Sequence, residues 1–124
     1  MNITFLDTQV FQLNFDATSQ EENINLRDFD ISFSPVFSKS NSNEFVIIFK
    51  LSLNNEEFSL LLEYAARFSV DAEIDEEFKT SHFVKVNAPA IAYPFLRAYI
   101  SNLTLNSGFL PIILPTINFT KFNK

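Results

Sequence analysis

A single histidine is the first candidate for chemistry in this chain of 124 residues. His82 follows Ser81 and lies close in sequence to the carboxylates Asp75, Glu76 and Glu77. This grouping suggests two hypotheses, a site for a hard metal ion or an acid–base pair. A histidine without a second imidazole or a thiolate is far more often structural. Adjacent side chains on an extended chain point apart, so Ser81 and His82 do not predict a catalytic triad. We therefore predict no metal, no cofactor and no enzyme.

Charge and composition narrow the classes of partner and compartment. The formal net charge is −6, which disfavours nucleic acid as a partner. With one glycine the chain cannot build a glycine-rich phosphate loop, and without cysteine it has no thiolate nucleophile and no disulfide framework. The first ten residues, MNITFLDTQV, lack the features of a signal peptide. We expect a cytoplasmic protein with no membrane insertion, formed as a single domain over residues 1–124.

Residues 87–119 favour a binding function over catalysis. This stretch holds four of the five prolines and the only glycine among many aliphatic and aromatic residues. Its polar residues and prolines break any apolar run long enough to cross a membrane. The stretch is therefore either core or an adhesive surface.

Alternating polar and apolar residues predict four antiparallel strands arranged as a meander. The strands cover residues 11–16, 28–33, 45–53 and 58–70. Phe11 shares its parity with Phe5, which allows an earlier start to the first strand, and a polar loop follows at residues 18–25. Pro35 is expected to weaken or end the second strand. A helix is the alternative for residues 58–70, but seven consecutive apolar alternations favour a strand.

The remainder predicts one long helix and an extended loop. An acidic segment at residues 71–78 leaves room for a short helix. From Ala88 to about Leu105 apolar residues recur at helical spacing, and Pro94 is expected to kink the helix or to begin its regular part. Residues 106–108 supply a stop signal, and two prolines keep residues 109–119 extended. The fold class is α+β. One sheet can hardly cover so much apolar surface, which predicts self-association, a peptide-binding groove, or both.

The order of elements and the motifs of the last third resemble the SecB-type export chaperones. Residues 88–119, APAIAYPFLRAYISNLTLNSGFLPIILPTINF, are similar to that family's kinked helix, its Gly-Phe-x-Pro turn and its Leu-Pro-x-x-Asn-Phe segment. The matching positions are Pro94, Arg97, Ile100, Ser101, Gly108, Phe109, Pro111, Leu114, Pro115, Asn118 and Phe119. The order of the elements agrees with the family over nearly the whole chain. Specific sequence motifs match only in this last third.

The resemblance implies a homo-oligomer, either a dimer or a dimer of dimers, that holds unfolded polypeptides or preproteins in apolar grooves without nucleotide. For the family members in the export pathway, the resemblance implies delivery to the SecA motor, partly through an acidic sheet face. Asp16, Leu61 and Glu63 match that face by position. The client-binding residues that the resemblance suggests are Phe29, Phe33, Phe37, Phe109, Leu110, Ile112, Ile113 and Phe119. Plain packing, within the subunit or against a neighbouring one, is the alternative for each of these apolar residues.

Family members usually continue past the Asn-Phe motif into a second helix and a tail that engages the motor, whereas this sequence stops at Lys124. We therefore expect weak or absent motor binding with client holding retained. The alternative function is that of a dedicated binding partner, such as a chaperone associated with a toxin–antitoxin pair, whose partner would then be a toxin.

Overall fold

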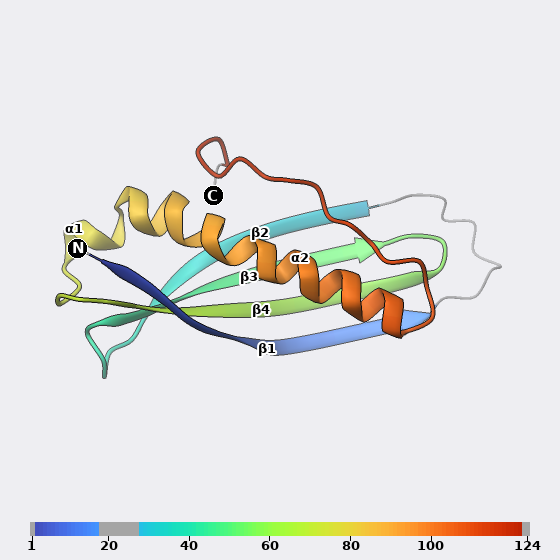
Figure 1. Cartoon of the computed structure of the whole chain (residues 1–124), viewed down its shortest axis with the longest axis horizontal. Coiled ribbons are helices and arrows are strands. Elements are labelled where there is room, and N and C mark those ends of the chain that lie inside the picture. Colours follow the sequence, from blue (N-terminus) through green and yellow to red (C-terminus); the bar gives the residue numbers. More distant parts are fainter. Residues whose placement is uncertain (1, 18–27, 123–124) are drawn as a thin grey trace.

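A four-stranded antiparallel sheet carries a long helix on one face (Figure 1). The computed structural model describes residues 2–17 and 28–122; the loop predicted at residues 18–25 lies outside them. The elements are β1 (Ile3–Ala17), β2 (Asp28–Phe37), β3 (Glu44–Asn54), β4 (Phe58–Val70), α1 (Glu76–Lys79), a π-helical segment η1 (Phe83–Asn87) and α2 (Ala88–Asn106). The four predicted strands, the long helix and the α+β class are confirmed. The early start of the first strand and the short helix in the acidic segment are confirmed as well.

The strand order is β1-β4-β3-β2, which corrects the expected meander in one respect. Strands β2, β3 and β4 are consecutive antiparallel neighbours, but β1 pairs with β4 and not with β2. Short connections at residues 38–43 and 55–57 keep the last three strands adjacent. Between β1 and β2 lie residues 18–27, enough chain to exceed the roughly 15 Å that three strand spacings span. The resulting order is that of a Greek key.

Pro35 does not end β2, which runs on to Phe37. The strand stays in register with β3, and Pro35 lies opposite Ile47. The physical reason is the position of β2 at the edge of the sheet. A proline lacks a backbone N–H, and an edge strand tolerates that loss where the missing donor faces outward.

The simple alternation in β1 is interrupted. Its register against β4 shifts between Phe5 and Asp7 and again between Val10 and Gln12. A β-bulge adds a residue to one strand and so moves the following side chains to the other face. Phe11, which alternation placed on the core face, falls at the second shift and stays exposed.

Helix α2 covers the sheet with small and aliphatic residues at every fourth position. Ala88, Ala92, Leu96 and Ile100 are all inaccessible to solvent, as expected for one face of a helix. They pack on the core face of the sheet. That face presents Phe45, Ile47, Phe49, Leu51 and Leu53 from β3, and Phe58, Leu60, Leu62, Tyr64, Ala66, Phe68 and Val70 from β4. Pro94 lies inside the helix, where its ring and its missing N–H kink the axis.

The end of α2 is a Schellman motif, as the predicted stop signal requires. The amide of Phe109 donates to the carbonyl of Thr104 over 3.0 Å, and that of Gly108 donates to Leu105 over 3.1 Å. Gly108 has a φ of 97°, a conformation that side chains disfavour. The chain then reverses direction and runs back alongside α2 (Figure 1). Residues 109–117 have no regular secondary structure, which confirms the predicted extended loop.

Candidate functional site

Polar side chains of α2 fix the backbone of the C-terminal loop, residues 109–119. The Tyr93 hydroxyl donates to the carbonyl of Pro115 over 2.5 Å, and the Ser101 hydroxyl donates to the carbonyl of Ile112 over 2.7 Å. Thr104 accepts from the amide of Ile112 over 3.0 Å. These three residues lie along one side of the helix. The loop is therefore held in place although it lacks a regular hydrogen-bond ladder.

Two apolar side chains of this loop point away from the protein. Leu110 is 84% exposed and Ile113 is 74% exposed, the highest values for large hydrophobic residues in the described part of the chain. Their neighbours Ile112 and Leu114 are half-buried and buried. A fixed backbone thus presents two aliphatic side chains to solvent, an arrangement typical of a binding surface.

The other predicted loop residues are less accessible. Phe109 is half-buried and packs on Phe15 and Phe58, with ring centroids 5.9 and 5.1 Å away. Phe119 is buried and contacts the ring of Tyr93 at 5.7 Å. Phe109 and Phe119 thus pack within this subunit. If they contact a bound ligand, they do so from beneath the exposed side chains Leu110 and Ile113.

The phenylalanines of β2 alternate on the core face and are half-buried. Phe33 contacts Phe119 at 5.7 Å and stacks on Phe122 at 5.5 Å. Phe29 and Phe37 pack on the core further along the strand. Beside Phe33 is a cavity of 320 Å³, which we call the β2 groove. Its lining residues are Phe33, Ser34, Pro35, Lys79, Val84, Lys85 and Phe122.

The sequence predicts Phe33 and Phe119 as client-binding residues, but it does not predict most of the residues that line this groove. Val84 and Lys85 belong to η1, a segment that no pattern in the sequence predicts. Phe122 lies beyond the motif that carries the resemblance. Only the tertiary packing of η1 and the C-terminal residues against an edge strand brings these groups together.

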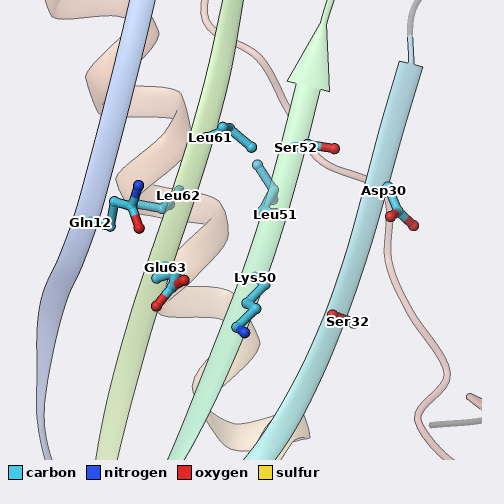
Figure 2. Close-up of a pocket in the computed structure, with 9 residues that line it drawn as sticks. All are labelled: Gln12, Asp30, Ser32, Lys50, Leu51, Ser52, Leu61, Leu62 and Glu63. Atoms are coloured by element: carbon cyan, nitrogen blue, oxygen red, sulfur yellow. The ribbon is translucent and has the colours of Figure 1, made fainter.

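The three predicted docking residues do share the outer face of the sheet, opposite α2. In the β1–β4 register Asp16 lies opposite Ser59, while Leu61 and Glu63 follow at alternate positions of β4. Leu61 is 49% exposed. Figure 2 shows Leu61, Glu63 and Gln12 around a second cavity, of 220 Å³, with the helix behind the sheet. Lys50 lies opposite Glu63 in the register, so this face is mixed in charge.

A charged network crosses the same face nearer the other end of the strands. Arg67 of β4 pairs with Asp7 of β1 at 2.7 Å and with Glu44 of β3 at 3.1 Å. Hydrogen bonding to Arg67 lowers the pKa of the Asp7 carboxyl below its usual value. The hydrogen bonds to Asp7 and Glu44 raise the pKa of Arg67 in turn. Arg67 and Asp7 are exposed and Glu44 is half-buried, so solvent screens the network, which adds little stability.

A band of apolar side chains remains uncovered between β1 and the adjacent side of α2. Phe95 is 46% exposed and stacks on Phe5 with ring centroids 4.7 Å apart. Ile91 is 43% exposed one turn earlier on the helix. Val10 and Leu13 of β1 are exposed as well. We call these residues the β1–α2 band; it borders an edge strand whose outer hydrogen-bonding groups are unpaired within the described structure.

The candidate metal ligands named from the sequence are not grouped together in the described structure. In residues 2–17 and 28–122 no three histidine, aspartate or glutamate side chains are grouped to hold a metal ion. His82 is exposed, and no hydrogen bond joins it to Ser81 in that part of the chain. None of the described helices has the length and apolar character to span a bilayer.

Comparison with known proteins identifies the family. The model of the SecB family, described as the preprotein translocase subunit SecB, matches residues 29–124. The chain belongs to the SecB family. Its curated relatives include the protein-export protein SecB of Rickettsia akari, 31% identical over 106 residues that cover 83% of this chain and 67% of the relative.

Other relatives extend the family likeness over shorter stretches. The SecB of Roseobacter denitrificans is 37% identical over 50% of this chain and 36% of its own length. An uncharacterised protein of Methanocaldococcus jannaschii is 33% identical over 66% of this chain and 56% of its own length. This SecB-family chain spans about half the length, or less, of most of the curated relatives it matches.

Solved structures share the fold. A SecB-like chaperone of Mycobacterium tuberculosis, in complex with a peptide from an antitoxin, matches with a TM-score of 0.73 at 17% identity. The match covers 94% of this chain and 90% of that one. A protein of unknown function from Streptococcus agalactiae matches with a TM-score of 0.56, also at 17% identity, over 94% of this chain and 98% of that one. At this identity the likeness supports the fold alone.

Proposed function

We propose that this SecB-family protein is an ATP-independent holdase, a chaperone that binds unfolded polypeptides and keeps them from aggregating. Membership of the family supports a chaperone and not an enzyme. The observation that carries the proposal is the pair Leu110 and Ile113, exposed on a loop whose backbone is hydrogen-bonded to α2. A fixed backbone lowers the entropy lost on binding, so apolar contacts to it contribute more fully to affinity.

The client surface that we propose runs from these two residues along the loop to the β2 groove. It would use the predicted residues in two ways. Leu110, Ile113 and Ile112 offer aliphatic contacts, while Phe33 and Phe119 form an aromatic floor with Phe122. Phe29 and Phe37 extend the same face of β2, and Phe109 supports the start of the loop.

An aggregation assay tests the proposal. The purified protein is added to several unrelated clients that have been reduced or chemically unfolded, and light scattering is followed with and without ATP. A holdase suppresses scattering of all of them at a stoichiometric ratio, and ATP changes nothing. Failure to protect any client would remove the chaperone function.

A dedicated partner is the second candidate. It is favoured by the solved relative that carries a peptide from an antitoxin. The two functions differ in selectivity, because a dedicated chaperone protects one protein and a holdase protects many. A toxin or antitoxin gene next to this one, together with protection of that product only, would favour the second candidate.

We also propose that the protein works as a homo-oligomer, a dimer or a dimer of dimers, in the cytoplasm. The β1–α2 band supplies the apolar surface, and the adjacent edge of β1 supplies unpaired backbone groups. Sedimentation at micromolar concentration measures the assembly. A monomer there would contradict the proposal.

Docking of a motor such as SecA is a separate proposal, made for Asp16, Leu61 and Glu63 on the outer face. Exposed charge pairs contribute about 0–1 kcal/mol each and are screened by salt, so we expect weak binding at physiological salt. Titration of SecA against the wild type and Glu63→Lys measures it. Tight binding that ignores Glu63→Lys would place the contact elsewhere.

A further inference from the structure

Two lysines line the β2 groove beside its aromatic floor. Lys79 is the last residue of α1, and Lys85 lies in η1. Among the described residues that line the cavity, only these two are charged. This is notable in a chain with a formal charge of −6, in which 15 acidic residues outnumber 9 basic ones. The groove therefore joins an apolar surface to a local positive charge.

The two ammonium groups differ in how accessible they are to a ligand. Lys85 is exposed and makes no ion pair within the described part of the chain. Lys79 pairs with Glu76 at 3.0 Å, but that carboxylate is 90% exposed, so solvent competes for it. The Lys79 ammonium also lies 5.5 Å from the centre of the Phe37 ring. The cation–π contact keeps this charge close to an aromatic surface.

The apolar part of the groove is formed by Val84 and by the rings of Phe33 and Phe122. Val84 is inaccessible to solvent, and the rings of Phe33 and Phe122 are stacked with an interplanar angle of 20°. Pro35 lies on the edge strand β2 and has no backbone N–H to donate to a segment lying here. The side chains of such a segment therefore contribute more to its recognition.

We propose that the β2 groove selects client segments in which an aspartate or glutamate lies beside an aromatic or large aliphatic residue. The inference rests on the proposed holding function and adds a specificity to it. The apolar side chain packs on Phe33 and Phe122, and the carboxylate meets Lys85 and Lys79. Segments with a lysine or arginine at the same place would be disfavoured by like charge.

Matched peptides test the proposal. Three fluorescent peptides share one aromatic–aliphatic sequence and differ at a single flanking position, which is Asp, Asn or Lys. The expected order of affinity is Asp, then Asn, then Lys, with the first and last separated by roughly three- to tenfold, as two exposed charge contacts allow. The advantage of Asp should shrink as salt rises. Equal affinities, or tighter binding of the Lys peptide, would overturn the proposal.

Variants locate the effect. Lys79→Gln with Lys85→Gln should remove the difference in affinity between the Asp and Asn peptides. Lys85→Gln alone, which keeps the Lys79–Phe37 contact, should reduce that difference. Lys50→Gln is the matched control for Lys85→Gln, because it also removes one positive charge but lies on the opposite sheet face. An advantage that persists in the double variant would overturn the assignment to this groove. If none of the peptides binds at all, the holding function itself is contradicted.

Discussion

The Tyr93 hydroxyl lies 2.5 Å from the carbonyl oxygen of Pro115, and this hydrogen bond ties the middle of α2 to the C-terminal loop. The two residues are far apart in sequence, and Pro115 is exposed at the surface. The contact therefore couples the folded core to the proposed client surface.

Removing this hydroxyl should loosen the loop. Tyr93→Phe deletes one hydrogen bond and leaves a carbonyl without its donor, so we expect a loss of about 0.5–1.5 kcal/mol in the free energy of unfolding. Amide exchange should rise in residues 112–117 before it rises in β3 or β4. Tyr99→Phe is the control, since no hydrogen bond of its hydroxyl occurs within the described residues. Unchanged exchange in Tyr93→Phe would show that the loop is held by packing alone.

Alkaline pH should weaken the same attachment. Burial raises the pKa of Tyr93 above its usual value of 10.0, while the Arg97 guanidinium lowers it to a smaller extent. Burial also raises the pKa of Tyr99. A phenol with a raised folded pKa keeps its full contribution below the unfolded pKa and loses it as pH rises through the folded pKa. Stability should therefore fall above pH 10.

Denaturant titrations across the alkaline range measure this loss, and tyrosinate absorbance reports the ionisation. The fall in stability should be smaller in Tyr93→Phe than in the wild type. A fall of equal size would mean that Tyr93 is not among the groups responsible.

Two charged substitutions on α2 should separate core from interface. Ile100 is inaccessible to solvent, so Ile100→Glu buries a charge and should unfold the subunit. Phe95 is half exposed in the β1–α2 band, so Phe95→Glu should keep the fold and lower the mass of the assembly. Circular dichroism and sedimentation distinguish the two results. Phe95→Glu with an unchanged mass would exclude this band from the interface.

The turn after α2 depends on one glycine. Gly108 has a φ of 97°, and an added Cβ would meet no atom within 4 Å. The cost of Gly108→Ala is therefore conformational and should be about 1 kcal/mol. Thermal unfolding measures it, with Ser107→Ala as the control at the neighbouring position. A neutral Gly108→Ala would show that the turn adjusts its backbone.

The sequence predicts the elements more fully than their arrangement. Alternation identifies β3 and β4 because both are central strands whose core face is covered along its length. It misplaces Phe11 because two bulges in β1 depend on pairing with β4, and such shifts leave no local signal. The sequence also predicts too early an end for β2, because a strand tolerates a proline such as Pro35 only at the edge of a sheet.

The candidate site divides in the same way. The sequence places Leu110 and Ile113 in an apolar loop broken by prolines, but it does not distinguish these two exposed residues from Ile112, which is half-buried, or Phe119, which is buried. The side-by-side placement of Leu61 and Glu63 follows directly from strand periodicity. Lys85 and Phe122 cannot be found this way, because η1 and the last described residues reach β2 only through tertiary packing.

The most direct test of the account is the affinity for an unfolded, apolar client peptide when the exposed loop residues are replaced. Leu110→Ser with Ile113→Ser removes two aliphatic contacts worth about 1–2 kcal/mol each, so affinity should fall by at least tenfold with melting temperature unchanged. Leu61→Ser removes a leucine that is 49% exposed on the outer face and should leave affinity as it was. Full affinity in the double variant, or an equal loss in Leu61→Ser, would contradict the assignment of client binding to the C-terminal loop.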